Sequence, residues 1–206
     1  MSQAYKKLIP LNVITGFLGS GKTSLLSNLL KLKSMKNTLV LVNEFGEVGL
    51  DNELIEYIDK DTVLLQSGCI CCTIREDLTS TLSDLLDRRF SNEISFNRVI
   101  LETTGLADPS PIIYSICKGN IIKNNYRLSN VITTVDAING IIHMSENYES
   151  KKQIAVADRI MITKSDIDKS NLSEILEKIK ELNPSAPIFY NNKKFSFNKI
   201  FKDDLF

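Results

Sequence analysis

The octapeptide GFLGSGKT at residues 16–23 constrains the fold of this chain more than any other feature. It fits the pattern G-x-x-x-x-G-K-[S/T], follows the apolar run LNVIT at residues 11–15 and opens a helical pattern at residues 22–33. Glycines let such a loop wrap a phosphate with its backbone N–H groups, and the following helix adds its positive N-terminal end. The alternative is a plain glycine-rich turn, but the full motif in this context favours a strand–loop–helix unit that binds phosphate groups.

Each part of this octapeptide has an expected role toward a nucleotide. Lys22 is expected to reach the terminal phosphates, and the hydroxyl of Thr23 is expected to ligate Mg²⁺. The predicted nucleotide contacts of the loop and the first helical turn are Gly16, Gly19, Ser20, Gly21, Lys22, Thr23 and Ser24. The motif therefore predicts a magnesium-dependent nucleotide site.

Short apolar runs alternate with helical patterns along the chain. Most runs are continuously apolar, which is typical of strands covered on both faces in a parallel sheet. The predicted strands are residues 11–15, 38–42, 62–66, 98–102, 131–135, 159–163 and 187–190, and the predicted helices are residues 22–33, 74–88 and 172–182. Ser170 and Asn171 are expected to cap the last helix. The alternation predicts an α/β fold with a doubly wound, mostly parallel sheet of the P-loop NTPase type.

Length and charge exclude several classes of protein. With 206 residues, 43% of them hydrophobic, the chain can bury one full core. Lys plus Arg and Asp plus Glu balance at 25 each, so neither a nucleic acid nor a membrane surface is an expected partner. No apolar run approaches the roughly 20 residues of a membrane span. The apolar N-terminal stretch leads into the glycine-rich motif instead of a cleavage site, so we expect a cytoplasmic protein.

The segment TKSD at residues 163–166 follows a predicted strand late in the chain. A guanine-specifying loop in P-loop GTPases reads N-K-x-D at that place. The Asp166 carboxylate can accept two hydrogen bonds from the edge of guanine, a pair that adenine does not offer, and the Lys164 stem would lie along the base. Thr163 lacks the amide reach of Asn, which leaves the sharpness of GTP preference open. A charged strand-end loop is the alternative interpretation.

Two further segments are expected to sense the γ-phosphate. The strand of residues 98–102 ends in Glu102, whose carboxylate can bind Mg²⁺ directly or through water. Gly105 can give its amide to the γ-phosphate, and Asp108 is a weaker candidate in the same loop. Residues 43–51 (NEFGEVGLD) occupy the place of a nucleotide-responsive switch. Glu102 and Gly105 therefore join Lys22 and Thr23 as catalytic candidates.

Three of the four cysteines, Cys69, Cys71 and Cys72, lie within four positions. In a reducing compartment such clusters are more often metal-binding or catalytic than disulfide-bonded. A closed structural zinc site needs four ligands, and the distant Cys117 and His143 are interpreted as a core thiol and a surface ring. An open site of thiolates with a carboxylate is favoured, and such soft donors select Zn²⁺, Co²⁺, Ni²⁺ or Cu⁺. A redox or regulatory thiol cluster and incidental loop cysteines are the alternatives.

Taken in order, these motifs resemble the CobW-type P-loop GTPases, relatives of the nickel chaperones for hydrogenase and urease. The matching segments are GFLGSGKT, NEFGEVGLD, GCICC, ETTGLADP, the VDA of residues 135–137, and TKSD, within residues 8–190. The resemblance implies a GTPase domain over residues 1–190, which uses GTP and Mg²⁺ and delivers a transition metal, Zn²⁺ or Co²⁺, to a client metalloprotein. It makes Cys69, Cys71 and Cys72 the metal ligands, and Lys22, Thr23, Lys164 and Asp166 nucleotide contacts.

The chain departs from the family pattern in three places. Thr163 stands where Asn is usual, and Val42 stands where some members have a carboxylate, which leaves Glu47 as the nearest acidic metal ligand. Members usually carry a C-terminal domain, often after a histidine-rich segment, so residues 191–206 are interpreted as a tail or the start of a second domain. No side chain stands out as a catalytic base, so slow intrinsic hydrolysis is expected.

Two other functions fit parts of the sequence. One is a metal or redox sensor that uses nucleotide only for stability, and the other is an ATP-dependent small-molecule kinase. A homodimer that depends on nucleotide or metal is compatible with the leading interpretation.

Overall fold

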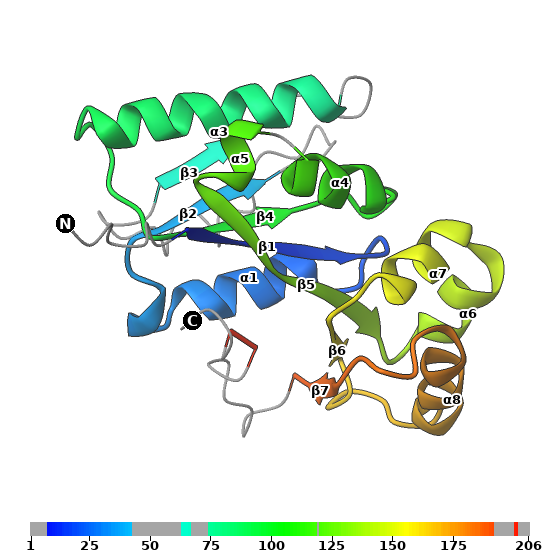
Figure 1. Cartoon of the computed structure of the whole chain (residues 1–206). Coiled ribbons are helices and arrows are strands. Elements are labelled where there is room, and N and C mark those ends of the chain that lie inside the picture. Colours follow the sequence, from blue (N-terminus) through cyan, green and yellow to red (C-terminus); the bar gives the residue numbers. More distant parts are fainter. Residues whose placement is uncertain (1–7, 43–62, 67–73, 119, 192–199, 202–206) are drawn as a thin grey trace.

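A computed structural model describes residues 8–42, 63–66, 74–118, 120–191 and 200–201, with only the backbone described at 63–66, 74–77 and 120–121. Within these ranges seven strands form one sheet in the order β3-β2-β4-β1-β5-β6-β7, and every neighbouring pair is parallel (Figure 1). The strands are β1 (Ile9–Gly16), β2 (Thr38–Val42), β3 (Val63–Gln66), β4 (Arg98–Glu102), β5 (Tyr126–Asp136), β6 (Arg159–Thr163) and β7 (Ile188–Tyr190). The predicted α/β fold with a parallel sheet is confirmed.

The predicted helices are confirmed, with differences at their ends. α1 (Lys22–Leu30) stops three residues early and is followed by a 3₁₀ turn, Lys33–Met35, while α3 (Ile74–Phe90) runs two residues further and α8 (Leu172–Leu182) matches. The capping prediction for α8 is wrong. Asn171 occupies the N-cap without a side-chain capping bond, and the N–H of Ser170 instead donates to Asp168 at 2.8 Å.

Four helices were not predicted: α4 (Ser110–Lys118), α5 (Asn120–Lys123), α6 (Gly140–Glu146) and α7 (Tyr148–Ala155). All four are short, between four and nine residues, so each offers few turns over which an apolar period can be recognised. No helix in the described ranges is both long enough and apolar enough to cross a lipid bilayer.

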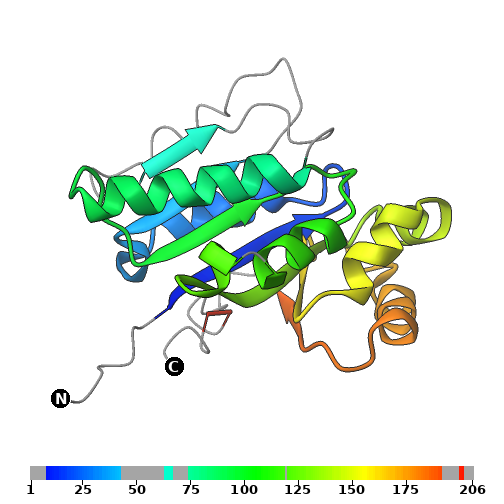
Figure 2. The same ribbon diagram turned by 45° about the horizontal axis from the view of Figure 1, so that its top comes forward.

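The sheet is covered on both faces (Figures 1 and 2). One face packs against α1, and its core contains Ile14, Leu25, Leu29, Ile100 and Met161. The other face packs against α3, α4 and α5, and its core contains Leu11, Val13, Leu82, Val99 and Ile116. A third core, with Val135, Ile160, Ile162, Ile175 and Ile179, joins the ends of β5 and β6 to α6, α7 and α8. Burial on both faces explains why the strands read as continuously apolar runs.

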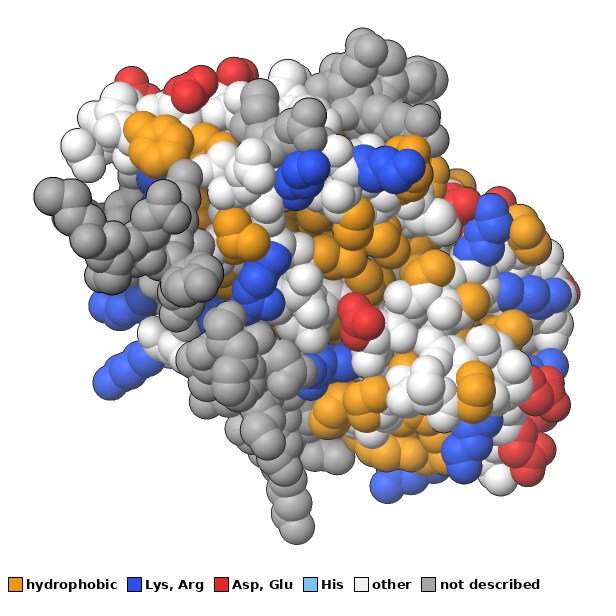
Figure 3. Space-filling model, viewed as in Figure 1, with side chains coloured by type: hydrophobic (Ala, Val, Ile, Leu, Met, Phe, Trp, Pro, Cys, Tyr) orange, Lys and Arg blue, Asp and Glu red, His pale blue; other side chains and the backbone are white. Residues whose placement is uncertain are grey.

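Two residues of the C-terminal segment belong to the α1 side of the core. Ile200 and Phe201 are buried there, and the Arg98 guanidinium lies 5.4 Å from the centre of the Phe201 ring. This part of the segment therefore packs on the same sheet as residues 8–191. On the face shown in Figure 3, Lys and Arg side chains are scattered among acidic and apolar ones, as the balanced composition leads one to expect.

Candidate functional site

The phosphate loop connects the carboxyl end of β1 to the first turn of α1. Gly16, Gly19 and Gly21 all have positive φ, at 143°, 67° and 85°. Gly21 is also the N-cap of α1, so a side chain there would be strained and would press against Thr163, whose Cγ2 lies 3.3 Å from an ideal Cβ position. The motif glycines therefore stand where the loop has backbone conformations that other residues rarely adopt.

Residues at the carboxyl ends of β5 and β6 form hydrogen bonds with the phosphate loop. The hydroxyls of Ser20 and Thr134 are 2.6 Å apart, and Thr163 Oγ1 donates to the Ser20 carbonyl at 2.7 Å. Lys164 Nζ donates to the Gly19 carbonyl at 2.8 Å. Thr163, expected to lack the reach of Asn, thus contacts the loop with its hydroxyl.

Lys22 and Thr23 begin α1 at the mouth of the loop. Lys22 is buried, and its Nζ donates to the Phe17 carbonyl at 3.3 Å, so its charge is held within the loop. Thr23 Oγ1 donates to Glu102 Oε1 at 2.8 Å, because β1 and β4 are neighbours and β4 ends beside the loop. The structure therefore brings together the two residues predicted to bind Mg²⁺. A hydroxyl and a carboxylate are the oxygen donors that this hard cation prefers. Ser24, the next residue of α1, is exposed.

Gly105 lies directly against the phosphate loop. A Cβ atom at Gly105 would come within 2.7 Å of the Leu18 backbone nitrogen and 2.8 Å of its Cα atom, a distance that real contacts do not reach. The same loop begins at Thr103, whose hydroxyl donates to Thr15 Oγ1 at 2.9 Å. The predicted γ-phosphate sensor is thus placed where the two loops touch.

Asp108, the weaker candidate, is committed to structural contacts. Its carboxylate accepts hydrogen bonds from Lys152 Nζ at 2.6 Å and from the Ser110 backbone N–H at 2.9 Å, at the start of α4. Burial, the largest influence, raises the pKa of Asp108, but the bonds from Lys152 and Ser110 together hold it below the ordinary 3.8. Asp108 therefore anchors the loop that carries Gly105.

The TKSD segment follows β6 beside the phosphate loop. Lys164 has a positive φ of 56°, and its Nζ lies 2.7 Å from the carboxylate of Asp136 at the end of β5. Burial raises the pKa of Asp136 most strongly, but the bonds from Lys164 and the Ile138 N–H outweigh it, so the pKa stays below 3.8. The sequence contains Asp136 in the VDA segment, yet no role was predicted for it.

Asp166 lines a pocket of about 250 Å³ next to this segment, together with Ser165, Lys169, Leu172 and Tyr190. Asp166 is exposed, and Tyr190 is half-buried at the carboxyl end of β7. A carboxylate and an aromatic ring in one pocket are suited to a flat ligand with hydrogen-bond donors on its edge. Lys164, which precedes the lining residues Ser165 and Asp166 in the sequence, contacts the phosphate loop at Gly19.

The surroundings of His143 and Cys117 differ from those predicted from the sequence, a surface ring and a core thiol. His143 is half-buried instead of lying free on the surface, with its ring centre 4.7 Å from that of Phe17 in the phosphate loop. Burial lowers its pKa, which the charge of Asp136 partly offsets. Cys117 is exposed, so it is not a core thiol. The sequence carried no signal for the environment of His143, because Phe17 lies far from it along the chain.

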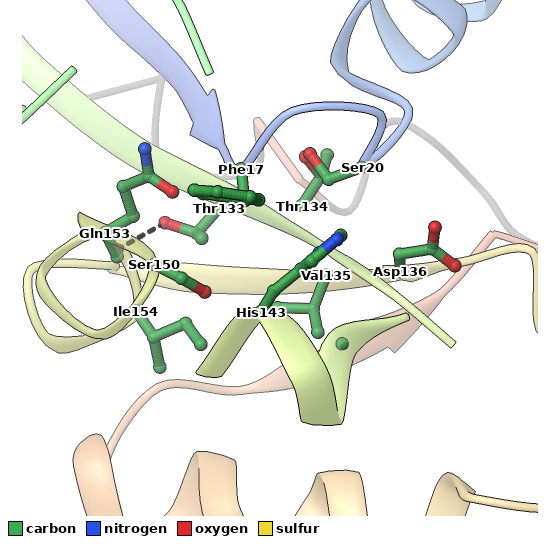
Figure 4. A pocket seen from close by; sticks show the side chains of 11 residues that line it. Phe17, Ser20, Thr133, Thr134, Val135, Asp136, His143, Ser150, Gln153 and Ile154 are labelled. Carbon is green, nitrogen blue, oxygen red and sulfur yellow. Dashed lines mark hydrogen bonds between the residues drawn. The ribbon is translucent and has the colours of Figure 1, made fainter. Parts of the chain in front are cut away.

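A cavity of about 10 Å³, near the size of one water molecule, lies behind the phosphate loop. Figure 4 shows the side chains that line it, among them Phe17 and Ser20 of the loop, His143 of α6 and Gln153 of α7. Gln153 is fully buried, and sequence reasoning missed it.

The predicted transition-metal ligands, Cys69, Cys71, Cys72 and Glu47, lie outside the described residues. Among the residues that the structure does describe, no group of three or more His, Cys, Asp or Glu side chains is arranged to hold a metal ion. The departure at Val42 can be located: it ends β2, paired with Gln66 on one side and Glu102 on the other.

The chain has relatives of known family. Residues 10–190 match the family model described as the CobW/HypB/UreG nucleotide-binding domain. The chain is 36% identical over 181 residues to the zinc chaperone YjiA of Escherichia coli K12, which covers 88% of this chain and 57% of that protein. It is 31% identical over 188 residues to the zinc-regulated GTPase metalloprotein activator 1 of Schizosaccharomyces pombe, covering 87% of this chain and 45% of that one.

A solved structure has the same fold. The Zn(II)-bound YjiA GTPase from E. coli matches with a TM-score of 0.76 at 28% identity, over 95% of this chain and 61% of that one. The chain thus spans about half to three-fifths of the length of these relatives.

Proposed function

Because this chain belongs to the CobW/HypB/UreG family of nucleotide-binding domains, we propose that it is a GTP-hydrolysing metallochaperone domain. In this proposal Cys69, Cys71 and Cys72 bind a transition metal, Zn²⁺ or Co²⁺, which is passed to a client metalloprotein. The names of two relatives, a zinc chaperone and a zinc-regulated GTPase metalloprotein activator, support this function.

One observation carries the nucleotide part of the proposal. Lys164 Nζ contacts both the Gly19 carbonyl of the phosphate loop and the Asp136 carboxylate. This ties the segment with Asp166 to the phosphate loop, so a base in the Asp166 pocket and phosphates in the loop can belong to one ligand.

Each residue of the site has a separate role in the proposed hydrolysis. In this proposal Lys22 stabilises negative charge on the terminal phosphates, and the backbone at Gly105 contacts the γ-phosphate, which the closeness of Gly105 to Leu18 of the phosphate loop supports. Thr23 and Glu102 would hold Mg²⁺, which neutralises charge on the transferred phosphoryl group. Slow intrinsic turnover is part of the proposal, as is a dependence on metal or client for faster turnover.

The chain topology supports a link between nucleotide and metal. The thiol segment connects β3, which ends at Gln66, to α3, which begins at Ile74. Gln66 pairs with Val42, and Val42 pairs with Glu102 of the proposed magnesium site. The segment therefore leaves the sheet at the edge where the phosphates would bind. If GTP tightens metal binding, metal must tighten GTP binding by the same factor.

Anaerobic titration of the purified chain with Zn²⁺, in the presence of GTP or GDP, tests the proposal. We expect metal affinity to differ between the two nucleotides by about five-fold or more, the lower range of measured couplings. Cys71→Ser should weaken metal binding strongly. The matched control is Cys117→Ser, which removes the exposed thiol of α4 and should leave the affinity unchanged. Equal affinity with both nucleotides contradicts the coupling, and failure of the wild type to bind zinc contradicts the metallochaperone.

A further inference from the structure

The side chain of Gln153 joins α7 to the loop that contains Gly105. Its Nε2 donates to the Gly105 carbonyl at 3.1 Å and to the Ala107 carbonyl at 3.0 Å. We infer that Gln153 is a positioning residue for GTP hydrolysis, which fixes this loop against the phosphate loop in the conformation that contacts the γ-phosphate. The inference rests on the GTPase function proposed above.

The orientation of the Gln153 amide follows from its neighbours. Two backbone carbonyls can only accept hydrogen bonds, so the NH₂ group must face them. Its other end, Oε1, has no hydrogen-bond partner within the part of the chain that the structure describes. Figure 4 shows this amide next to Phe17 of the phosphate loop. A fully buried amide that uses only its donors is placed to hold the two carbonyls.

Holding these carbonyls sets the direction of the neighbouring amide. In a trans peptide the C=O and the N–H point in opposite directions. With the Gly105 carbonyl turned toward Gln153, the N–H of Leu106 points away from α7, and Leu106 itself is 57% exposed. Gln153 therefore determines the direction of the Leu106 N–H, the donor that follows Gly105 in this loop. A donor that is already oriented needs no reordering during the reaction.

Further contacts restrain both the Gly105 loop and α7. Gly105 packs directly against the Leu18 backbone. Further along the loop, Lys152 Nζ lies 2.6 Å from the Asp108 carboxylate. The backbone carbonyl of Gln153 accepts a 2.7 Å bond from Thr133 of β5, so α7 is itself fixed to the sheet. A chain of direct contacts thus runs from β5 through Gln153 to the loop beside the phosphates.

Gln153→Met tests this role, because Met keeps the length of the side chain and removes both donors. The matched control is Asn183→Leu. Asn183 is also a buried amide, and its Nδ2 donates to the Ile154 and Ala157 carbonyls at 2.9 and 2.8 Å, at the carboxyl end of α7 and not in the Gly105 loop. The control loses bonds of the same kind and should lower thermal stability at least as much.

We expect Gln153→Met to lower kcat for GTP hydrolysis about ten-fold, the size expected for one or two lost hydrogen bonds that act in the transition state. Its affinity for GDP, which lacks the γ-phosphate, should stay within about two-fold of wild type. Asn183→Leu should keep kcat within about two-fold despite its lower stability. An unchanged kcat in Gln153→Met, an equal loss in the control, or a parallel loss of GDP affinity overturns the inference.

A second variant covers the case in which Gln153→Met does not fold. Lys152→Met removes the ion pair with Asp108, the second side-chain contact that holds this loop, and the Lys152 side chain is about one-third exposed. We expect kcat to fall about three-fold, the effect of losing a partly exposed ion pair. An unchanged kcat overturns the inference. A wild type that neither binds nor hydrolyses GTP removes the proposed function, and this inference with it. A wild type that hydrolyses GTP as fast as Gln153→Met overturns this inference alone.

Discussion

The two ends of the proposed nucleotide site are built in different ways. At the phosphate end, Ser20, Lys22 and Glu102 are all at most 5% exposed, and the loop is held by contacts from β4, β5 and β6. At the base end, Asp166 is exposed and its neighbour Ile167 is 71% exposed. The first end is part of the core, whereas the second is a surface loop fixed to the core by a few side chains.

This difference suggests that binding strength and base preference are separable. The phosphate loop contacts a ligand through backbone groups and one lysine, which do not distinguish GTP from ATP. The carboxylate of Asp166 touches only the base in the proposed complex, so it adds discrimination without holding the phosphates. Substitutions at the two ends should therefore have different effects on affinity and on base preference.

Lys22→Ala should cause the largest loss. Removing the ammonium leaves the phosphate charge without its buried partner, and we expect GTP and ATP affinities to fall together by about 100-fold or more, the cost of a lost buried charge interaction. Fluorescence titration with both nucleotides measures this. Lys31→Ala, at the exposed end of the same helix, is the control and should bind normally. A fall in GTP affinity with unchanged ATP affinity would contradict the division between the two ends.

Asp166→Asn should lower the preference for GTP over ATP by about ten- to 100-fold, because an amide no longer accepts both donors of the guanine edge. ATP affinity should not fall, since the phosphate end is untouched. Competition between the two nucleotides measures the ratio. Asp168→Asn, two residues away, is the control. An ATP preference in the wild type would instead support the small-molecule kinase interpretation.

The sequence predicted the strands of the sheet, the phosphate loop and the placement of Glu102 beside Thr23, because each depends on a local pattern or on the edge where parallel strands end. It did not predict Gln153 or the role of Asp136. Their contacts, to Gly105 and Lys164, span 48 and 28 residues, and they exist only because β5 lies between β1 and β6 in the sheet. Strand order is a property of the assembled sheet, so local periodicity carried no signal for these side chains.

Asp136→Asn should have a smaller effect than Lys22→Ala or Asp166→Asn. It removes a charge that contacts no nucleotide atom in the proposed complex and acts on the base end only through its ion pair with Lys164. We expect the free energy of unfolding to fall by about 1 kcal/mol at neutral pH, the typical net value of one hydrogen bond. GTP affinity should fall by about five-fold, a similar free energy. Equilibrium denaturation in urea measures the first effect. Asn keeps the shape of Asp, and its carbonyl can still accept from the Ile138 N–H, so the remaining change reports on the pair with Lys164 and on the 3.3 Å bond from Asn139 Nδ2.

The pH dependence of this variant identifies the charge as the cause. Because folding lowers the pKa of Asp136 below 3.8, its stabilisation is fully present above 3.8 and is lost as the pH falls through the lower folded-state value. The stability difference between wild type and Asp136→Asn should therefore be constant from neutral pH to about pH 5 and shrink below the ordinary aspartate pKa. Most of the difference should also disappear when Lys164 is replaced by Met in both chains, and the remainder belongs to the bond from Asn139. A difference that is undiminished in the absence of Lys164 would mean that Asp136 stabilises its own turn and not the base-reading segment.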